Sequence, residues 1–412
     1  MTDGFDVAIV GGSIAGQALA ARLARAGGLR VALIDAAPAP SRRLVGGCSL
    51  RRGTLERLAA IFGVAPEALM ARLGAPQSCF SELGVSFPRD HGDRWEVQHR
   101  LVRAACDGAP IGLSVRHALV LEALRSLLPP EVHRREGRVP AGGYTGEALH
   151  VETEAGTEAL PLAPGHRVVN ASANPRLLRA EIALPPPRRW VAAVQVPLRP
   201  DDAAPGPSLG YAPAAYGDHG RHLAFFTPFW DPASPEATWY GINTTVLETE
   251  RLEAVGREAI LADLEERLGA WAEGAGFSRV DPEQTTGRAV VPISERSGVQ
   301  WQQLLGDGSP VVEGSLTLSA GAQAINVDGM LAQAVGADAL ADSLLRHPTA
   351  TGPGLFPTVD RALHGIRRRN RILQGLYFTV PHGALAATFR VTPMGVLRSL
   401  VGDWAGLGAP PE

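Results

Sequence analysis

Lysine is missing from this chain of 412 residues, in which all 39 basic residues are arginine. A Schiff base, a lysine general base and a lysine phosphate clamp are therefore excluded from its chemistry. Positive charge is not in excess either, because the formal net charge is −3. Since phosphate binding needs a basic surface, nucleic acid is not expected as a partner.

Cysteine is scarce, and long apolar runs are absent. Cys48, Cys79 and Cys106 are widely spaced and odd in number, so we expect neither a disulfide framework nor a zinc site. No apolar run approaches the roughly 18 residues that span a bilayer. The stretch MTDGFDVAIV lacks the basic start and the apolar core of a signal peptide. We expect a reduced, cytoplasmic protein without membrane insertion.

The histidine pattern gives no signature of metal chemistry. The 11 histidines form no H-E-x-x-H motif and no cluster with ligand spacing, so no metal site is expected. The fragment GVSFP, residues 84–88, contains no G-x-S-x-G elbow for a catalytic serine. The chain is 45% hydrophobic and long enough for two or three domains, which predicts an ordinary globular protein.

The N-terminal stretch DVAIVGGSIAGQALAARLARAGGLRVALID has the order strand, glycine-rich turn, helix and strand. Gly11 permits a tight turn, the small Ser13 lets the backbone approach a pyrophosphate, and Gly16 lets helix and strand pack closely. The pyrophosphate is expected at the helix N-terminus, where free amides and the helix dipole favour an anion. Asp35, 19 residues after Gly16, is near the expected place of the acid that binds ribose. The predicted nucleotide contacts are Gly11, Gly12, Ser13, Ile14, Ala15, Gly16 and Asp35.

This stretch closely resembles the N-terminus of flavoprotein monooxygenases of the p-hydroxybenzoate hydroxylase type. Two later segments support the resemblance: RRLVGGCSLRRGTLERLAAIFGV (Arg42–Val64) and IGLSVRHALVLEALRSLL (Ile111–Leu128). In that family an arginine at the position of Arg116 begins a helix and reaches the flavin. The resemblance therefore implies FAD as the cofactor, with Arg43 and Arg116 among its contacts.

One motif of that family is altered between Asn170 and Arg179. The family has Gly-Ala-Asp-Gly-x-x-Ser-x-x-Arg there, and only Ala171 and Arg179 match it. Ser172 and Ala173 replace the Asp-Gly pair, which in the family is associated with both the flavin and the nicotinamide donor. The change argues against direct use of NADH or NADPH. The alternative is drift in a turn that still folds.

A second motif is altered in LTLSAGAQAINVDGMLAQAVGADALADSLL, residues 316–345. The family's strand and glycine-led helix are matched, but Thr317 or Gly321 stands where an aspartate holds a ribityl hydroxyl. Loss of that hydrogen bond predicts weaker FAD retention, by about 1–3 kcal/mol. The resemblance still implies flavin contacts from Gly321, Gly329 and Met330, with the helix N-terminus near the pyrimidine ring.

The two-component styrene and indole monooxygenases also lack the Asp-Gly turn and take reduced FAD from a separate reductase. The chain is similar to them in length and in its arginine-rich segment LHGIRRRNRILQGLYFTV, residues 363–380. This similarity implies a flavin reductase as a candidate partner. The alternative is that the arginines form an exposed helix face: Arg367, Arg368, Arg369 and Arg371.

From about Ile182 the sequence changes to proline-bounded strands rich in aromatic and β-branched residues, followed by an amphipathic helix over residues 248–276. In the family such a sheet covers the flavin and supplies the substrate cavity. Strand alternation sends Phe226 or Trp239 toward that cavity, with Asn243 as a polar contact. These three are the candidate substrate-binding residues, and the alternative is that each aromatic belongs to the core.

The predicted fold is α/β, with a Rossmann-type FAD-binding domain (a parallel sheet with helices), a mixed β-sheet substrate domain and C-terminal helices. Residues 1–182 and 301–345 form the two parts of the FAD-binding domain. Residues 183–300 form the β-rich substrate domain, and residues 346–412 the C-terminal helical region. A loop over residues 349–358 is expected to join the FAD-binding domain to the C-terminal helices.

The expected function is FAD-dependent hydroxylation or epoxidation of a lipophilic or aromatic small molecule, in secondary metabolism. Flavin halogenases share the fold, but their essential lysine and their W-x-W-x-I-P motif are absent, so halogenation is excluded. Two alternatives remain: an FAD-dependent dehydrogenase, oxidase or reductase, and a degenerate flavoprotein without a catalytic role. No catalytic acid or base is identified.

Overall fold

The computed structural model describes most of the chain in separate stretches. They are residues 4–36, 47–73, 78–80, 82–86, 100–103, 112–172, 186–202, 208–213, 221–229, 238–280, 287–292, 311–312, 329–348 and 352–380, with residues 384, 387 and 391. Arg43, Ala173 and Gly321, which the sequence analysis singled out, lie outside these stretches. Within them, no helix is both long and apolar enough to cross a membrane.

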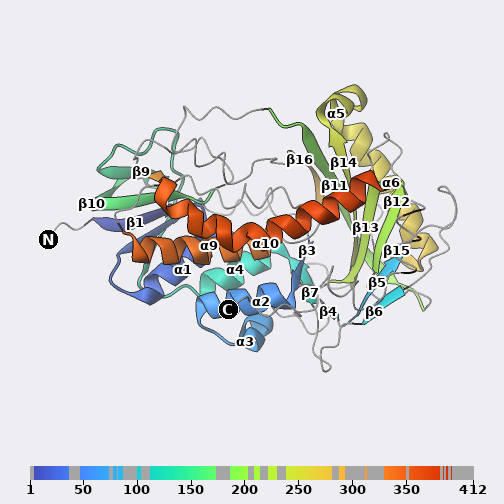
Figure 1. Cartoon of the computed structure of the whole chain (residues 1–412), viewed down its shortest axis with the longest axis horizontal. Coiled ribbons are helices and arrows are strands. Elements are labelled where there is room, and N and C mark those ends of the chain that lie inside the picture. The colour runs from blue at the N-terminus through green and yellow to red at the C-terminus, as the bar shows by residue number, and fades with distance from the viewer. Residues whose placement is uncertain are drawn as a thin grey trace.

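A parallel sheet forms one half of the molecule (Figure 1). The central strands β1 (Phe5–Val10) and β2 (Val31–Asp35) are nearly continuous apolar runs that are largely buried, whereas the edge strand β8 (Val132–Glu136) is polar and mostly exposed. Strand β10 (Gly156–Asn170) continues from an antiparallel hairpin with β9 (Ala148–Thr153) into the sheet, where it pairs with β1. The strand order is β17 (Val311–Val312), β10, β1, β2 and β8.

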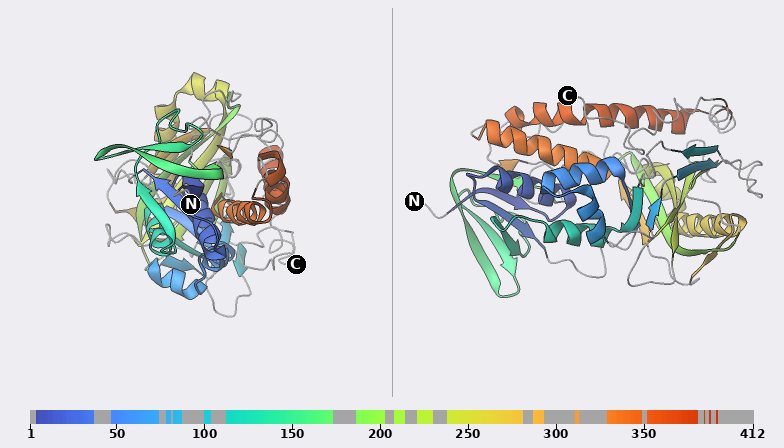
Figure 2. Two further views of the ribbon diagram at one scale, coloured as in Figure 1. Left: turned by 90° about the vertical axis from the view of Figure 1, so that its left-hand side faces the viewer. Right: turned by 90° about the horizontal axis from the view of Figure 1, so that it is seen from below.

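Helices cover one face of this sheet and share a core with it. They are α1 (Ile14–Ala26), α2 (Arg52–Phe62), α3 (Pro66–Arg72), α4 (His117–Ser126), α9 (Gly329–Arg346) and α10 (Gly352–Thr379). The longest, α10, packs against α9 and extends from the parallel sheet toward the second sheet (Figures 1 and 2). Helix α10 also replaces most of the loop that was expected at residues 349–358.

The loop prediction failed although Pro357 lies inside α10, where it removes one backbone hydrogen bond at a cost of about 3 kcal/mol. The apolar side chains of Leu355, Phe356, Val359 and Leu363 are buried in the core. Their burial stabilises the helix by roughly 1.5–3 kcal/mol for each large side chain. The summed stabilisation from these four side chains exceeds the cost of one proline in the helix.

The second sheet forms the other half of the molecule, and α5 (Thr249–Val255) and α6 (Arg257–Gly274) lie beside it (Figure 1). Gly256, with φ 87°, separates the two helices and divides the single helix expected over residues 248–276. The strand order is β15 (Phe277–Arg279), β11 (Arg189–Pro200), β14 (Trp239–Glu248), β13 (Arg221–Pro228), β12 (Ser208–Pro213), β5 (Glu82–Ser86) and β6 (Arg100–Arg103), and β16 (Gly287–Pro292) also pairs with β11.

Two features join the halves. Strands β5 and β6 extend the second sheet, although their residues lie in the segment 1–182 that was assigned to the FAD-binding domain. A small antiparallel sheet of β3 (Gly47–Arg51), β7 (Gly112–Arg116) and β4 (Cys79–Phe80) lies next to β13. The second half is therefore built from two separate parts of the chain.

Candidate cofactor site

The turn between β1 and α1 has the backbone geometry that its glycines permit. Gly11 has φ 116°, and a Cβ atom there would lie 2.7 Å from the Ser172 amide nitrogen. A Cβ atom at Gly16 would lie 1.9 Å from the Gly11 carbonyl oxygen. A side chain at either position is therefore incompatible with this turn.

The start of α1 is arranged to receive an anion. Ser13 is the N-cap: its hydroxyl accepts a hydrogen bond from the Gly16 amide at 3.3 Å and donates one to the Ala171 carbonyl at 3.0 Å. The amides of Ile14 and Ala15 lie in the first turn, where a helix has no internal acceptors for them. Free amides and the helix dipole together favour a phosphate at this point.

Asp35 ends β2 beside this turn. Its Oδ1 accepts a hydrogen bond from the Gly12 amide at 3.0 Å, and its Oδ2 forms an ion pair with Arg125 at 2.6 Å. The Gln17 side chain fixes the turn from the other side by donating to the Gly12 carbonyl at 2.8 Å. The carboxylate therefore faces the glycine turn, as expected for an acid that binds a ribose.

A cavity of about 250 Å³ adjoins Asp35. It is smaller than the usual range for drug-sized ligands, about 300–1,000 Å³, and suits a nucleoside-sized group. Its lining is charged and polar apart from two leucines, and comprises Gln17, Leu33, Asp35, Arg125, Leu128, Arg134, Arg135 and Glu136.

The altered turn after β10 keeps its fold without the Asp-Gly pair. Asn170 is fully buried at the end of β10, and its Oδ1 accepts hydrogen bonds from the Ser172 amide at 3.0 Å and the Ser172 hydroxyl at 2.6 Å. The Ala171 amide donates to the Val10 carbonyl at 2.8 Å, which holds the turn against the Gly11 loop. Hydrogen bonds to the Asn170 side chain thus stabilise the turn, and residue 172 provides no carboxylate.

The remaining predicted cofactor residues lie at the ends of helices and strands. Arg116 ends β7 and is the partly buried N-cap residue of α4. Gly329 and Met330 begin α9, and Met330 is buried in the core. The structure thus brings the Gly11–Gly16 turn and Asp35 together, and places Arg116 where β7 meets α4 and Gly329 and Met330 at the start of α9.

The side chains of Phe226, Trp239 and Asn243 lie on the face of the second sheet that α6 covers, as the alternative of a core role for the two aromatic residues predicts. Phe226 and Trp239 pack against Phe277, with ring centroids 5.5 and 5.1 Å apart, in the core under α6. Asn243 is fully buried and donates from Nδ2 to the Leu264 carbonyl of α6 at 2.9 Å. All three therefore point to the helix-covered face of the second sheet.

The alternate residues of the same strands point the other way, toward the parallel-sheet half. The Tyr240 hydroxyl lies 3.2 Å from the Ser49 hydroxyl, which lies 2.7 Å from that of Ser114. Ser114 in turn lies 2.9 Å from the Thr227 hydroxyl. This buried chain of four hydroxyl groups connects β14 and β13 to the small sheet.

The four residues of the hydroxyl chain are buried. Burial raises the pKa of the Tyr240 phenol far above its usual value, and raises the pKa of the neighbouring Cys48 thiol to about 12. Both groups are therefore neutral at physiological pH. Phe229 packs edge-on against Tyr240, with ring centroids 4.9 Å apart, and extends the apolar surface. The sequence analysis missed Ser49, Ser114 and Thr227, whereas Phe229 and Tyr240 belong to the aromatic segments that it associated with the substrate cavity.

No protein-family model matches the chain, and no curated protein matches its sequence. Solved structures do match. A flavoprotein/dehydrogenase from Cytophaga hutchinsonii has a TM-score of 0.64 at 16% identity, over 97% of this chain and 92% of that one. The p-nitrophenol 4-monooxygenase of Pseudomonas putida has a TM-score of 0.61 at 14% identity over all of both chains. An HpxO variant of Klebsiella pneumoniae, complexed with FAD, has a TM-score of 0.56 at 12% identity, over 97% of this chain and 99% of that one.

The chain has the fold of flavoprotein monooxygenases and dehydrogenases. The predicted fold class is therefore confirmed: a parallel sheet with helices, joined to a second sheet and C-terminal helices. At these identities the likeness extends to the fold and not to a shared substrate.

Proposed function

We propose that the chain is an FAD-dependent monooxygenase that acts on a lipophilic or aromatic small molecule. The observation that carries this proposal is the Gly11–Gly16 turn, which joins a glycine backbone at positive φ to a helix N-terminus and to Asp35. That combination fits a dinucleotide with a pyrophosphate and a ribose. The fold shared with p-nitrophenol 4-monooxygenase and HpxO supports FAD as that dinucleotide.

Each part of the site has a role toward the cofactor. The amides of Ile14 and Ala15 would hold the pyrophosphate, and Asp35 would accept hydrogen bonds from the adenosine ribose. Gly329 and Met330, at the start of α9, would place a helix N-terminus near the flavin ring. Bound FAD would supply the activation of dioxygen, while the chain supplies binding, orientation and exclusion of water.

We place the substrate against the face of the second sheet that carries Tyr240. Phe225, Ile242 and Tyr240 alternate with residues that point to α6, and Phe225 and Tyr240 are almost fully buried. The buried hydroxyl chain fixes this face against the small sheet. An apolar surface with few hydroxyl groups suits a lipophilic substrate and keeps water away from the reacting atoms.

Electrons would arrive as reduced FAD from a separate flavin reductase. The turn at Ser172 is completed by Asn170 and carries no acid, whereas the related single-component hydroxylases have an Asp-Gly pair there. A protein that borrows reduced FAD needs neither a nicotinamide site nor tight cofactor retention. Loss of the acid therefore favours the two-component arrangement.

The visible absorbance spectrum of FAD, recorded at equilibrium while the purified protein is added in excess and without removal of the unbound fraction, tests the proposal. We expect the FAD absorbance bands to shift and the shift to saturate. A spectrum that stays the same as in a flavin-free control such as serum albumin contradicts the proposal.

The likeness to the Cytophaga hutchinsonii flavoprotein/dehydrogenase favours a second candidate, an FAD-dependent dehydrogenase or reductase. This activity also needs no nicotinamide site, because a substrate can pass its hydride directly to the flavin. Anaerobic bleaching of the FAD-loaded protein by the substrate alone would identify a dehydrogenase. Oxygen incorporation into product would identify a monooxygenase.

A further inference from the structure

Arg125, in helix α4, forms an ion pair with Asp35, the acid predicted to bind the ribose. It lies in the last turn of α4, and side chains in a helix lean toward the helix N-terminus. This direction brings its guanidinium to Asp35, where the Nη2–Oδ2 distance is 2.6 Å. The Gly12 amide holds the other carboxylate oxygen at 3.0 Å. Asp35 is thus fixed from two sides.

The carboxylate keeps acceptor capacity for a ribose. An ionised carboxylate has about four lone-pair positions, and the two donors to Asp35 use one on each oxygen. Two positions therefore remain for the two ribose hydroxyl groups. Arg125 is about one-third exposed, so it can hold this orientation without being part of the apolar core.

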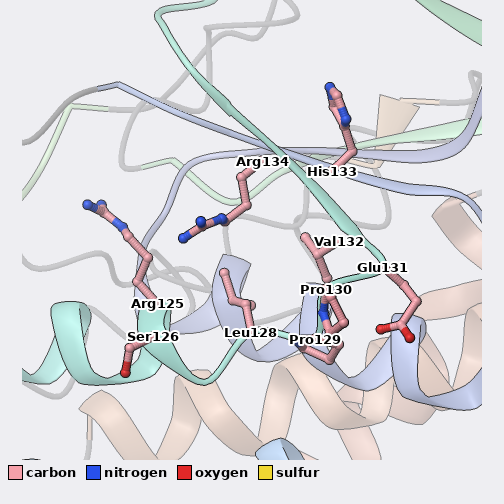
Figure 3. Close-up of a pocket in the computed structure, with 9 residues that line it drawn as sticks. All are labelled: Arg125, Ser126, Leu128, Pro129, Pro130, Glu131, Val132, His133 and Arg134. Atoms are coloured by element: carbon pink, nitrogen blue, oxygen red, sulfur yellow. The ribbon is translucent and has the colours of Figure 1, made fainter.

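The same arginine lines two adjoining cavities. One is the 250 Å³ cavity beside Asp35, and the other is a pocket of about 530 Å³ along β8. Figure 3 shows the side chains of Arg125 and Arg134 extending to the same side, while those of Glu131 and His133, which also line the larger pocket, extend in other directions. Leu128 and Arg134 line both cavities as well. A flat, uncharged base beside the ribose would find two guanidinium groups and a leucine, which suits stacking.

Resting on the proposed function, we propose that Arg125 is a positioning residue for the adenosine half of FAD. It orients the Asp35 carboxylate toward the ribose and thereby sets the preference of the site for FAD over FMN. FMN has the same flavin ring but no adenosine, so it gains nothing from Asp35 or from the cavities beside it. Arg125 therefore affects the affinity for FAD and leaves the affinity for FMN unchanged.

Flavin fluorescence titrations of the full chain with FAD and with FMN test this role. Arg125→Met removes the guanidinium and retains the apolar stem, and we expect it to raise the Kd for FAD about tenfold while the Kd for FMN changes less than about twofold. Arg125→Lys should recover part of the loss. The matched control is Arg346→Met, which removes an exposed arginine–aspartate pair at the end of α9. It should behave as the wild type.

A double-mutant cycle separates positioning from direct contact. If Arg125 acts through Asp35, then Arg125→Met should have little further effect on FAD affinity in an Asp35→Asn background. An equal loss in both backgrounds, an equal loss for FAD and FMN, or no loss relative to Arg346→Met overturns the inference while FAD binding stands. A wild-type chain that binds no FAD instead overturns the proposed function.

Discussion

His222 should make the second half of the molecule sensitive to acid. Its ring is fully buried under α6, where Nδ1 donates to Asn243 Oδ1 at 3.3 Å and Trp271 packs edge-on. Burial, together with the Arg267 charge, lowers its pKa from 6.5 to about 4, and Asp263 only partly offsets this. A depressed histidine pKa means that the unfolded chain binds the proton more readily. Stability is therefore complete above pH 6.5 and is lost as the pH falls toward 4.

The size of the effect follows from the shift. A change of one pKa unit corresponds to about 1.4 kcal/mol, so a shift from 6.5 to about 4 corresponds to about 3 kcal/mol. No discount for solvent screening applies, because the side chain has no exposed surface. Between pH 7 and pH 4 the free energy of unfolding should fall by about this amount through His222 alone.

Urea unfolding at several pH values between 7 and 4, at constant ionic strength, measures this effect. The variant His222→Gln retains an amide donor for Asn243 and cannot titrate, so its stability should fall by about 3 kcal/mol less than that of the wild type. His347→Gln, at the exposed end of α9, serves as the control and should follow the wild type. Identical pH dependence for wild type and His222→Gln would refute the reasoning.

Three further predictions concern the second sheet and the electron donor. Phe226→Ala should lower the free energy of unfolding by about 3–5 kcal/mol because it empties the core under α6. Phe225→Ala removes an equally buried ring and should be destabilising as well, but it should in addition lower kcat/KM, because Phe225 lies on the proposed substrate face; a larger loss of kcat/KM in Phe226→Ala than in Phe225→Ala would contradict the assignment of the faces. Ser114→Ala should lower the free energy of unfolding in urea by about 1–3 kcal/mol, because the buried hydroxyl groups of Ser49 and Thr227 lose their hydrogen bonds to Ser114. An unchanged unfolding midpoint would argue against the hydroxyl chain. In anaerobic stopped-flow mixing, NADH or NADPH should not bleach the FAD-loaded protein at catalytic rates, with or without substrate; rapid bleaching would show a self-sufficient hydroxylase.

The N-terminal site could be predicted because its determinants are local. Gly11, Ser13 and Gly16 fix a single turn, and Asp35 ends the next strand, so their spacing already contains the geometry. The ion pair from Arg125 to Asp35 could not be predicted in this way. It joins residues 90 positions apart, and only the packing of α4 against α1 brings them together.

The direction of the second sheet's side chains could not be predicted from alternation. Phe225 and Phe226 are equally buried, each 4% exposed, because one face meets α6 and the other meets the parallel-sheet half. A strand that is covered on both faces has no polar face to fix its phase. The pairing of β5 with β12 could not be predicted either, because residues 84–86 and 208–210 are distant in sequence.

An equilibrium titration with FAD, followed by flavin fluorescence on the wild-type chain and on Gly11→Val, tests most directly whether FAD occupies the Gly11–Gly16 turn. The account predicts saturable binding by the wild type, competition by ADP, and loss of binding in Gly11→Val, because a Cβ atom at Gly11 meets the Ser172 backbone where φ is 116°. Equal FAD affinity of a folded Gly11→Val variant, or binding that ADP does not affect, would contradict it.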